Sequence, residues 1–163
     1  MSLNDVYAKP GHLFRRMQQI AVAIFMDECA AFDLTPVQFA ALVAIHEHPG
    51  IDATRLSSLI AFDRSTLGDV LERLETKGLV QRGPTPEDRR VKVLRLSASA
   101  QKTLRDIMPA VDRAQDRMLA PLQPDDRVVL VRLLKELIGA NNEQSRAPLG
   151  TVTSADIKRV ARR

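Results

Sequence analysis

Residues 63–97 read DRSTLGDVLERLETKGLVQRGPTPEDRRVKVLRLS, and this stretch decides the fold. Its first half predicts an amphipathic helix between Asp63, a favourable N-cap residue, and Gly78, a favourable residue for a helix end. The apolar residues of this half follow the i, i+3, i+4, i+7 spacing of one helical face: Leu67, Val70, Leu71 and Leu74. The opposite face is polar, so one side of the helix is expected to pack on a core while the other faces outward.

The second half of the same stretch predicts a two-stranded hairpin with a long tip. Two short runs that contain β-branched residues, LVQR at 79–82 and VKVLRL at 91–96, lie on either side of Gly83, Pro84 and Pro86. The tip between them carries three adjacent charged residues, Asp88, Arg89 and Arg90. A projecting tip of this kind can place arginines in a groove that packed strands cannot enter.

Two helices are expected before this stretch. Thr35 as N-cap and Pro36 at the first helical position predict the start of a helix that stops at Pro49 and Gly50. Asp52 can cap a short helix whose apolar residues are Leu56, Leu59 and Ile60.

The order of these elements predicts a winged helix-turn-helix. The short helix is joined to the helix after Asp63 by the tight turn AFDRS at 61–65, and the hairpin follows at once. In such a unit the second helix enters the major groove of DNA. The hairpin, or wing, reaches along the backbone or into the narrow minor groove, where enhanced negative potential attracts arginine. The predicted fold class is therefore mainly α with a small β-hairpin wing.

Residues 63–97 resemble the signature of the MarR family of bacterial transcriptional regulators. Within them, Asp88-x-Arg90-x5-Leu96-Ser97 is similar to the family's wing pattern, with Ser97 where threonine is usual, and both residues can cap the next helix. The layout of flanking helices is similar over roughly residues 11–140. The resemblance implies an obligate homodimer that binds a pseudo-palindromic double-stranded DNA operator, usually as a repressor, and is released by a small ligand.

Long helices are predicted on both sides of the winged unit. One runs from about residue 11 to residue 31, a second begins at Ser97 and breaks at the prolines near residue 121, and a final helix spans about 125–140. Their apolar faces are wider than one winged domain can cover, which predicts a dimer interface. We expect four segments: an N-terminal dimerisation helix at 1–34, the winged helix-turn-helix DNA-binding domain at 35–97, C-terminal dimerisation helices at 98–142, and a basic, flexible tail at 143–163.

The polar face of the helix after Asp63 carries the first set of candidate DNA contacts: Arg64, Ser65, Thr66, Asp69 and Arg73. Ser65 and Thr66 lie in the first turn, where recognition helices usually meet base edges. Asp69 repels phosphate, so we expect it either to hold Arg73, four residues on, or to accept a hydrogen bond from a cytosine amine. The alternative interpretation is a solvated face whose hydroxyls only cap the helix.

The wing tip carries the second set of candidate DNA contacts. Arg90 is the first candidate, with Asp88 as its orienting partner. Arg89 is either a backbone contact or a charge that aids solubility. An exposed turn with compensating charges is the alternative for the whole tip.

We expect an effector that is an aromatic carboxylate or its thioester, bound between the first helix and the winged domain, partly because the family resemblance implies one. On a helical wheel, His12 and Arg16 form an i, i+4 pair beside the apolar stripe, where Arg16 could clamp a carboxylate and His12 could donate a second bond. Arg15, on the other flank, is the reserve candidate. Pairing of Arg16 with Asp27 or a partner subunit is the alternative. The candidate ring and pocket residues are Phe14, Phe25, Phe39 and His46.

Redox or zinc sensing within the same fold is a second hypothesis. Cys29 follows Asp27 and Glu28, which raise rather than lower a thiol pKa, so a buried packing role is favoured over peroxide sensing. His46 and His48 point away from each other on a helix, and a shared zinc ion would need ligands from elsewhere. His46 is instead expected in the core or a pocket. We predict no metal site and no cofactor.

The bulk composition fits a DNA-binding regulator without requiring one. The chain has 163 residues, a net charge of +4 and one cysteine, which is compatible with nucleic acid and a reducing compartment. No signal peptide is evident and the apolar run IAVAIFM is too short to span a bilayer, so we expect a cytoplasmic protein with no membrane partner. No catalytic motif is present, so an enzyme is not expected. A winged-helix protein-interaction module without DNA binding remains the alternative.

Overall fold

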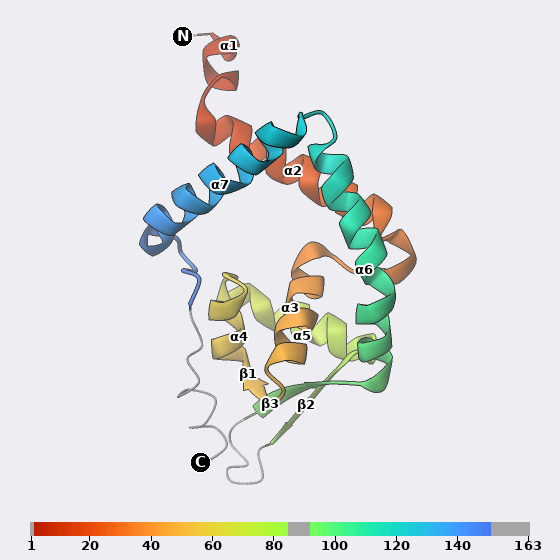
Figure 1. Ribbon diagram of the computed structural model, residues 1–163. Helices are drawn as coiled ribbons and strands as arrows, with labels where there is room; N and C mark the ends of the chain where they lie inside the picture. Colours follow the sequence, from red (N-terminus) through yellow and green to blue (C-terminus); the bar gives the residue numbers. More distant parts are fainter. Residues whose placement is uncertain (1, 85–91, 151–163) are drawn as a thin grey trace.

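The computed structural model describes residues 2–84 and 92–150 and is shown in Figure 1. In this part of the chain the α-helices are α1 (Leu3–Tyr7), α2 (Pro10–Glu28), α3 (Pro36–Glu47), α4 (Ala53–Leu59), α5 (Arg64–Thr76), α6 (Ala98–Leu119) and α7 (Pro124–Asn141). The strands are β1 (Ile51–Asp52), β2 (Val80–Pro84) and β3 (Lys92–Leu96), and two short 3₁₀ helices are η1 (Ala30–Phe32) and η2 (Asn142–Gln144). The fold is mainly α with a small sheet, as the sequence predicts.

The helix boundaries follow the capping residues. Thr35 and Gln38 form a capping box at the start of α3, with the Thr35 N–H donating to the Gln38 Oε1 at 3.1 Å. Asp52 caps α4 and Ser97 caps α6, each through a side-chain oxygen that accepts from a first-turn N–H. At the end of α5, Gly78 has φ of 67°, a left-handed conformation that glycine adopts without strain. These four predictions are confirmed.

The wing belongs to a three-stranded antiparallel sheet of order β1-β3-β2. The predicted hairpin is confirmed, with Val80 opposite Leu96 and Pro84 opposite Lys92. The third strand, β1, was not predicted, and it pairs Ile51 with Leu94 on the other side of β3. A strand of two residues is too short to show the alternating pattern on which strand prediction depends.

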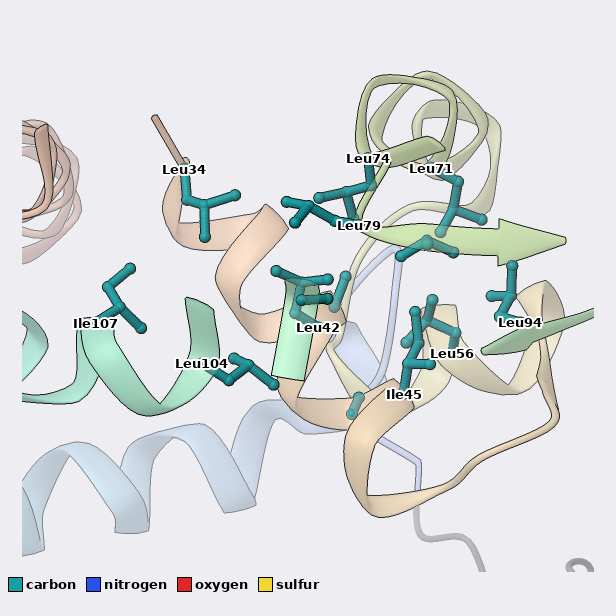
Figure 2. Packing of buried hydrophobic residues seen from close by; sticks show 14 of the residues in the cluster. Leu34, Leu42, Ile45, Leu56, Leu71, Leu74, Leu79, Leu94, Leu104 and Ile107 are labelled. Atoms are coloured by element: carbon teal, nitrogen blue, oxygen red, sulfur yellow. The ribbon is translucent and has the colours of Figure 1, made fainter. Parts of the chain in front are cut away.

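The hydrophobic core lies inside the winged lobe, which comprises α3, α4, α5 and the sheet, and it continues along the first half of α6 (Figure 2). Leu42, Leu56 and Leu74 are completely buried, and they come from three different helices. Burial of each such side chain contributes about 1.5–3 kcal/mol relative to exposure. The core therefore fixes the orientation of α5, whose leucine face it holds.

A layer of long helices lies above the lobe in Figure 1, where α2 runs beside α6 and α7 crosses near α2. Ion pairs join the end of α2 to α6. The Glu28 carboxylate pairs with the Nε of Arg113 at 3.2 Å and with an Nη of Arg117 at 3.1 Å. Arg117 also pairs with Asp27. The first long helix is slightly shorter than predicted, because η1 replaces its last turn.

The outer helices leave much apolar surface exposed. Although α7 is fully described, none of its residues is buried. The large hydrophobic side chains that this layer exposes include Leu13, Phe14, Met17, Ile20, Val128, Val131, Leu137 and Ile138. Among the described residues, no helix is both long enough and apolar enough to cross a bilayer.

The chain does not leave the molecule directly after α7. We expect a free tail from residue 143, whereas residues 145–150 run from the end of α7 towards α4 (Figure 1). There the N–H of Gly150 donates to the carbonyl oxygen of Ser58 at 2.8 Å. Residues 151–163 lie outside the described residues.

Candidate nucleic-acid interface and ligand cleft

The exposed face of α5 carries every candidate DNA contact that the sequence places on this helix. Arg64, Ser65, Thr66, Asp69 and Arg73 are all exposed, while the leucines of the opposite face are buried. The helix is therefore held by one face and presents a polar face outward. That arrangement suits a recognition helix, which must project from a rigid support into the major groove.

The first turn of α5 is organised by Asp63. Its Oδ1 accepts from the N–H of Ser65 at 2.8 Å and from the Ser65 hydroxyl at 2.6 Å. These hydrogen bonds, the side-chain one first, hold the pKa of the Asp63 carboxyl below its ordinary value, although slight desolvation opposes them. The hydroxyl of Thr66 donates to the Asp63 carbonyl oxygen at 3.1 Å.

These bonds determine what the two hydroxyls can offer a base. A hydroxyl has one donor and two lone pairs, and both donors are used inside the turn. The lone pairs of Ser65 and Thr66 remain to accept hydrogen bonds, and the amino groups of adenine and cytosine are the donors in the major groove. Capping and base contact are therefore compatible roles for the same residues.

The middle of the exposed face is a shallow depression lined by Asp69, Glu72, Arg73, Thr76 and Lys77. Among the described residues, the ion pair expected between Asp69 and Arg73 is not formed. Asp69 therefore remains a candidate to accept a hydrogen bond from a cytosine amine, with a solvated face as the alternative. The mixture of charges favours contact with base edges over simple binding of phosphate.

The tip of the wing, with the predicted contacts Asp88, Arg89 and Arg90, lies outside the described residues. At its base, an Nη of Arg82 contacts Glu75 Oε2 at 3.1 Å and so joins β2 to α5.

Two basic residues at the base of the wing were not among the candidates that the sequence suggested. Arg82 and Lys92 line a hollow between α5 and the wing. The sequence did contain a signal for Lys92, because it is a basic residue within the predicted strand at 91–96.

A mostly apolar cleft of about 570 Å³ lies between the outer helices and the winged lobe. Its walls come from four places in the chain: α2, the turn before α5, the end of α7 and the segment after it. The lining residues are Phe14, Ala61, Leu134, Leu137, Ile138, Asn141, Asn142, Ser145, Ala147 and Leu149. The cleft has the size and apolar composition of a small-molecule site, and the amides of Asn141 and Asn142 at its wall are hydrogen-bonded within the chain.

Only one of the predicted ligand residues, Phe14, lines this cleft. Phe25 is buried in the core, where its ring lies 5.9 Å from that of the partly buried Phe39. Phe25 lies eleven positions after Phe14 on α2, a rise of about 16 Å. One small ligand cannot use both ends of α2. His46, expected in the core or a pocket, is exposed near the end of α3, so its place in the core is wrong and its place in a pocket stays a prediction.

The predicted cationic clamp is on the surface. Arg16 donates from an Nη to the Gln19 Oε1 at 3.0 Å, and the ring of His12 lies 5.0 Å from that of Tyr7. Arg15 is exposed. Within the described part of the chain, no cationic residue lines the cleft. The alternative that pairs Arg16 with Asp27 is not observed, because Asp27 pairs with Arg117.

The structure favours a packing role for Cys29. The side chain is buried, burial raises the pKa of its thiol, and Glu28 raises this pKa further against an opposing effect of Arg113. A thiol in that setting reacts slowly because little thiolate forms. No group of three or more histidine, cysteine, aspartate or glutamate residues that could hold a metal ion occurs among the described residues.

Comparison with known proteins places these features in context. The sequence model of the MarR family matches residues 34–92. The chain is 31% identical over 137 residues to the HTH-type transcriptional repressor NicR of Pseudomonas putida, covering 84% of this chain and 87% of that protein.

Two solved structures are informative. BpsR of Bordetella bronchiseptica, whose DNA binding is regulated by 6-hydroxynicotinic acid, is 28% identical with a TM-score of 0.74, over 80% of this chain and 94% of that one. The transcriptional repressor CouR, bound to a 23-mer DNA duplex, is also 28% identical with a TM-score of 0.75, over 84% of this chain and 97% of that one.

Proposed function

The chain belongs to the MarR family of transcriptional regulators, and we propose that it represses transcription as a homodimer bound to a pseudo-palindromic operator. The observation that carries this proposal is the exposed polar face of α5, which the core holds beside the wing. Arg64, Ser65, Thr66, Asp69 and Arg73 are the proposed contacts on α5.

A dimer supplies the geometry that an operator requires. Two recognition helices must be separated by about 34–36 Å to enter successive major grooves on one side of the duplex. The exposed apolar side chains of α2 and α7 support a partner subunit at this layer, since contiguous surfaces of this kind usually mark an interface.

We propose that the effector is an aromatic carboxylate or its thioester and that its ring occupies the cleft against Phe14. BpsR, whose regulation by 6-hydroxynicotinic acid is noted above, supports this chemical class. Arg15 and Arg16 do not line the cleft, and on α2 they point about 100° and 200° away from Phe14, so a clamp by either requires a ligand that extends beyond the cleft. Release then requires that the ligand favour a spacing of the two lobes that differs from the one DNA requires.

Selection from a random duplex pool tests the DNA-binding function. The full-length protein should enrich a pseudo-palindrome, and its affinity for that site should fall steeply with salt. A winged helix that serves only protein interaction predicts no enrichment and no salt-sensitive binding. Either of those results would refute the proposed function.

Calorimetry tests the effector. Benzoate, hydroxybenzoate, hydroxycinnamate and nicotinate derivatives, with their thioesters, should include a ligand that also weakens binding to the selected operator. The double variant Arg15→Ala, Arg16→Ala should bind it at least tenfold more weakly, about 1.4 kcal/mol, whereas the exposed control Arg105→Ala should not. Binding that survives the double variant excludes the clamp, and no binding by any compound excludes the effector class.

A further inference from the structure

Residues 145–150, here called the C-terminal strap, connect the outer helices to the DNA-binding lobe. The strap leaves η2 at the end of α7 and reaches α4, so it closes a loop between elements that are far apart in the sequence (Figure 1). The hydrogen bond from Gly150 to Ser58, at 2.8 Å, is its anchor on the lobe. A Cβ added to Gly150 would lie 3.0 Å from the Ser58 Cβ, so the contact at this anchor is close.

Asn142, which precedes the strap, binds its C-terminal end as well. Its Oδ1 accepts from the N–H of Leu149 at 2.8 Å, and its Nδ2 donates to the Leu149 carbonyl oxygen at 3.2 Å. Both backbone groups of one strap residue are thus satisfied by a single side chain. The C-terminal end of the strap is therefore anchored twice, at Leu149 by Asn142 and at Gly150 by Ser58, and residues 143–148 form the loop between Asn142 and Leu149.

The path of the strap brings Arg146 beside the recognition helix. Its Nη2 lies 3.9 Å from the Oδ2 of Asp63, the N-cap residue of α5. The Arg146 side chain is 93% exposed, and an ion pair that is this long and this exposed adds little stability. The guanidinium is therefore available to another anion at the end of α5 that meets DNA.

We propose that Arg146 is a DNA-backbone contact and that the strap extends the DNA-binding surface of the winged lobe. This inference rests on the proposed function. Asp63 at the N-cap of α5 and Asp69 and Glu72 on its exposed face carry carboxylates that repel phosphate, and Arg146 supplies a positive charge next to the first of them. Arginine suits that position because its planar fork can bind phosphate through two parallel hydrogen bonds.

The salt dependence of binding to a random-sequence duplex, long enough to span two half-sites, tests the contact. Loss of one phosphate contact lowers the slope of log K against log salt by about 0.9, so Arg146→Ala should lower it by about 2 for a dimer. Arg132→Ala is the matched control, because Arg132 is exposed on α7 and pairs with Glu136. An Arg146→Ala slope equal to that of wild type, like that of the control, would overturn the inference.

A second variant tests the strap itself. Gly150→Pro removes the N–H that binds Ser58 and introduces a Cβ into the close contact there. It should reduce the salt slope as Arg146→Ala does, and adding Arg146→Ala should then have no further effect. A wild-type slope in Gly150→Pro would show that docking does not position Arg146.

The outcome also separates this inference from the function on which it rests. If wild-type protein binds duplex DNA with salt dependence and Arg146→Ala is unchanged, only the inference fails. If wild-type protein shows no salt-dependent binding, the proposed function and the inference fail together. Circular dichroism of each variant confirms that the comparison is made between folded proteins.

Discussion

The winged lobe buries its large apolar side chains, whereas the outer helices leave many of theirs exposed. In the lobe, Leu42 and Leu74 are completely buried by other residues of the same chain. In the outer helices, Val128 is 70% exposed and Leu13 is 54% exposed. The lobe therefore holds the recognition helix through contacts within one chain, whereas the outer layer has apolar surface available to a second copy. The core of the lobe therefore stabilises the DNA-binding unit, and the apolar surface of the outer helices would set the distance between two such units.

The largest expected effect is in the lobe. Leu42→Ala removes a completely buried side chain that packs at the centre of the core, and we expect it to lower the free energy of unfolding by about 2–5 kcal/mol. Urea denaturation followed by circular dichroism measures this loss. Gln81→Ala, at an exposed position of β2, is the control and should change stability by less than about 0.5 kcal/mol. Equal effects of the two variants would contradict the place of Leu42 in the core of the lobe.

A smaller effect is expected in the outer layer, on association. Val128→Asp combined with Val131→Asp places two charges on the exposed apolar surface of α7, where a partner would have to desolvate them. We expect dimerisation to weaken roughly 100-fold, about 2.7 kcal/mol. Sedimentation equilibrium at micromolar concentration should show the 18.1 kDa species for this variant and twice that mass for wild type.

The same charges placed on the lobe are the control for association. Thr54→Asp combined with Gln81→Asp adds two carboxylates at exposed positions, and this variant should remain dimeric. A wild-type monomer would refute the dimer outright. A dimer that tolerates both charges on α7 would place the interface elsewhere.

The lobe could be predicted from sequence because its signals are local. The hydroxyl and carboxylate caps at Thr35, Asp52, Asp63 and Ser97 each act within three residues of the helix they start, and spacing alone reveals them. The leucine face of α5 is likewise a property of one short segment. The structure keeps these helix boundaries and this buried face because the packing of the core is consistent with the local preferences of the sequence.

The ligand cleft could not be predicted in the same way, because it depends on which distant elements meet. A helical wheel places His12 and Arg16 on one flank of α2, but it does not say what lies opposite that flank. The residues that meet Phe14 across the cleft come from α7 and the strap, more than 100 positions later in the chain. The docking of Gly150 on Ser58 has the same origin, since nothing local in a polar tail indicates its partner.

A more modest effect is expected at the outward face of the lobe. Ser65→Ala removes a hydroxyl whose lone pairs face outward from the first turn of α5, and we expect altered preference at one base pair of each half-site. The loss should be about 1 kcal/mol, the usual value of one hydrogen bond. Selection from a random duplex pool measures it. Thr76→Ala, in the last turn, should leave base preference unchanged, and a shift as large as that of Ser65→Ala would argue against the assigned orientation of α5.

The smallest effect concerns the point where the two regions meet, at Asp63. Hydrogen bonds from Ser65 lower the pKa of this carboxyl most, and the charge of Arg146 in the strap lowers it least. An aspartate whose pKa is lower in the folded state than in the unfolded state stabilises the protein at pH values above the unfolded-state pKa, which is about 4. This stabilisation is lost as the pH falls through the folded-state pKa. Wild-type stability should therefore fall below about pH 4 by slightly more than that of Asp63→Asn, whose amide still caps α5 but does not titrate in this range.

Titration of the Asp63 carboxyl by NMR separates the contributions of lobe and strap. The pKa should rise clearly in Ser65→Ala, which loses the hydroxyl donor, and only slightly in Arg146→Ala, which loses a charge 3.9 Å away at an exposed site. This order is expected because a short hydrogen bond to the charged form outweighs a screened, distant charge. The reverse order would mean that the strap, and not the first turn of the recognition helix, controls the ionisation of its N-cap.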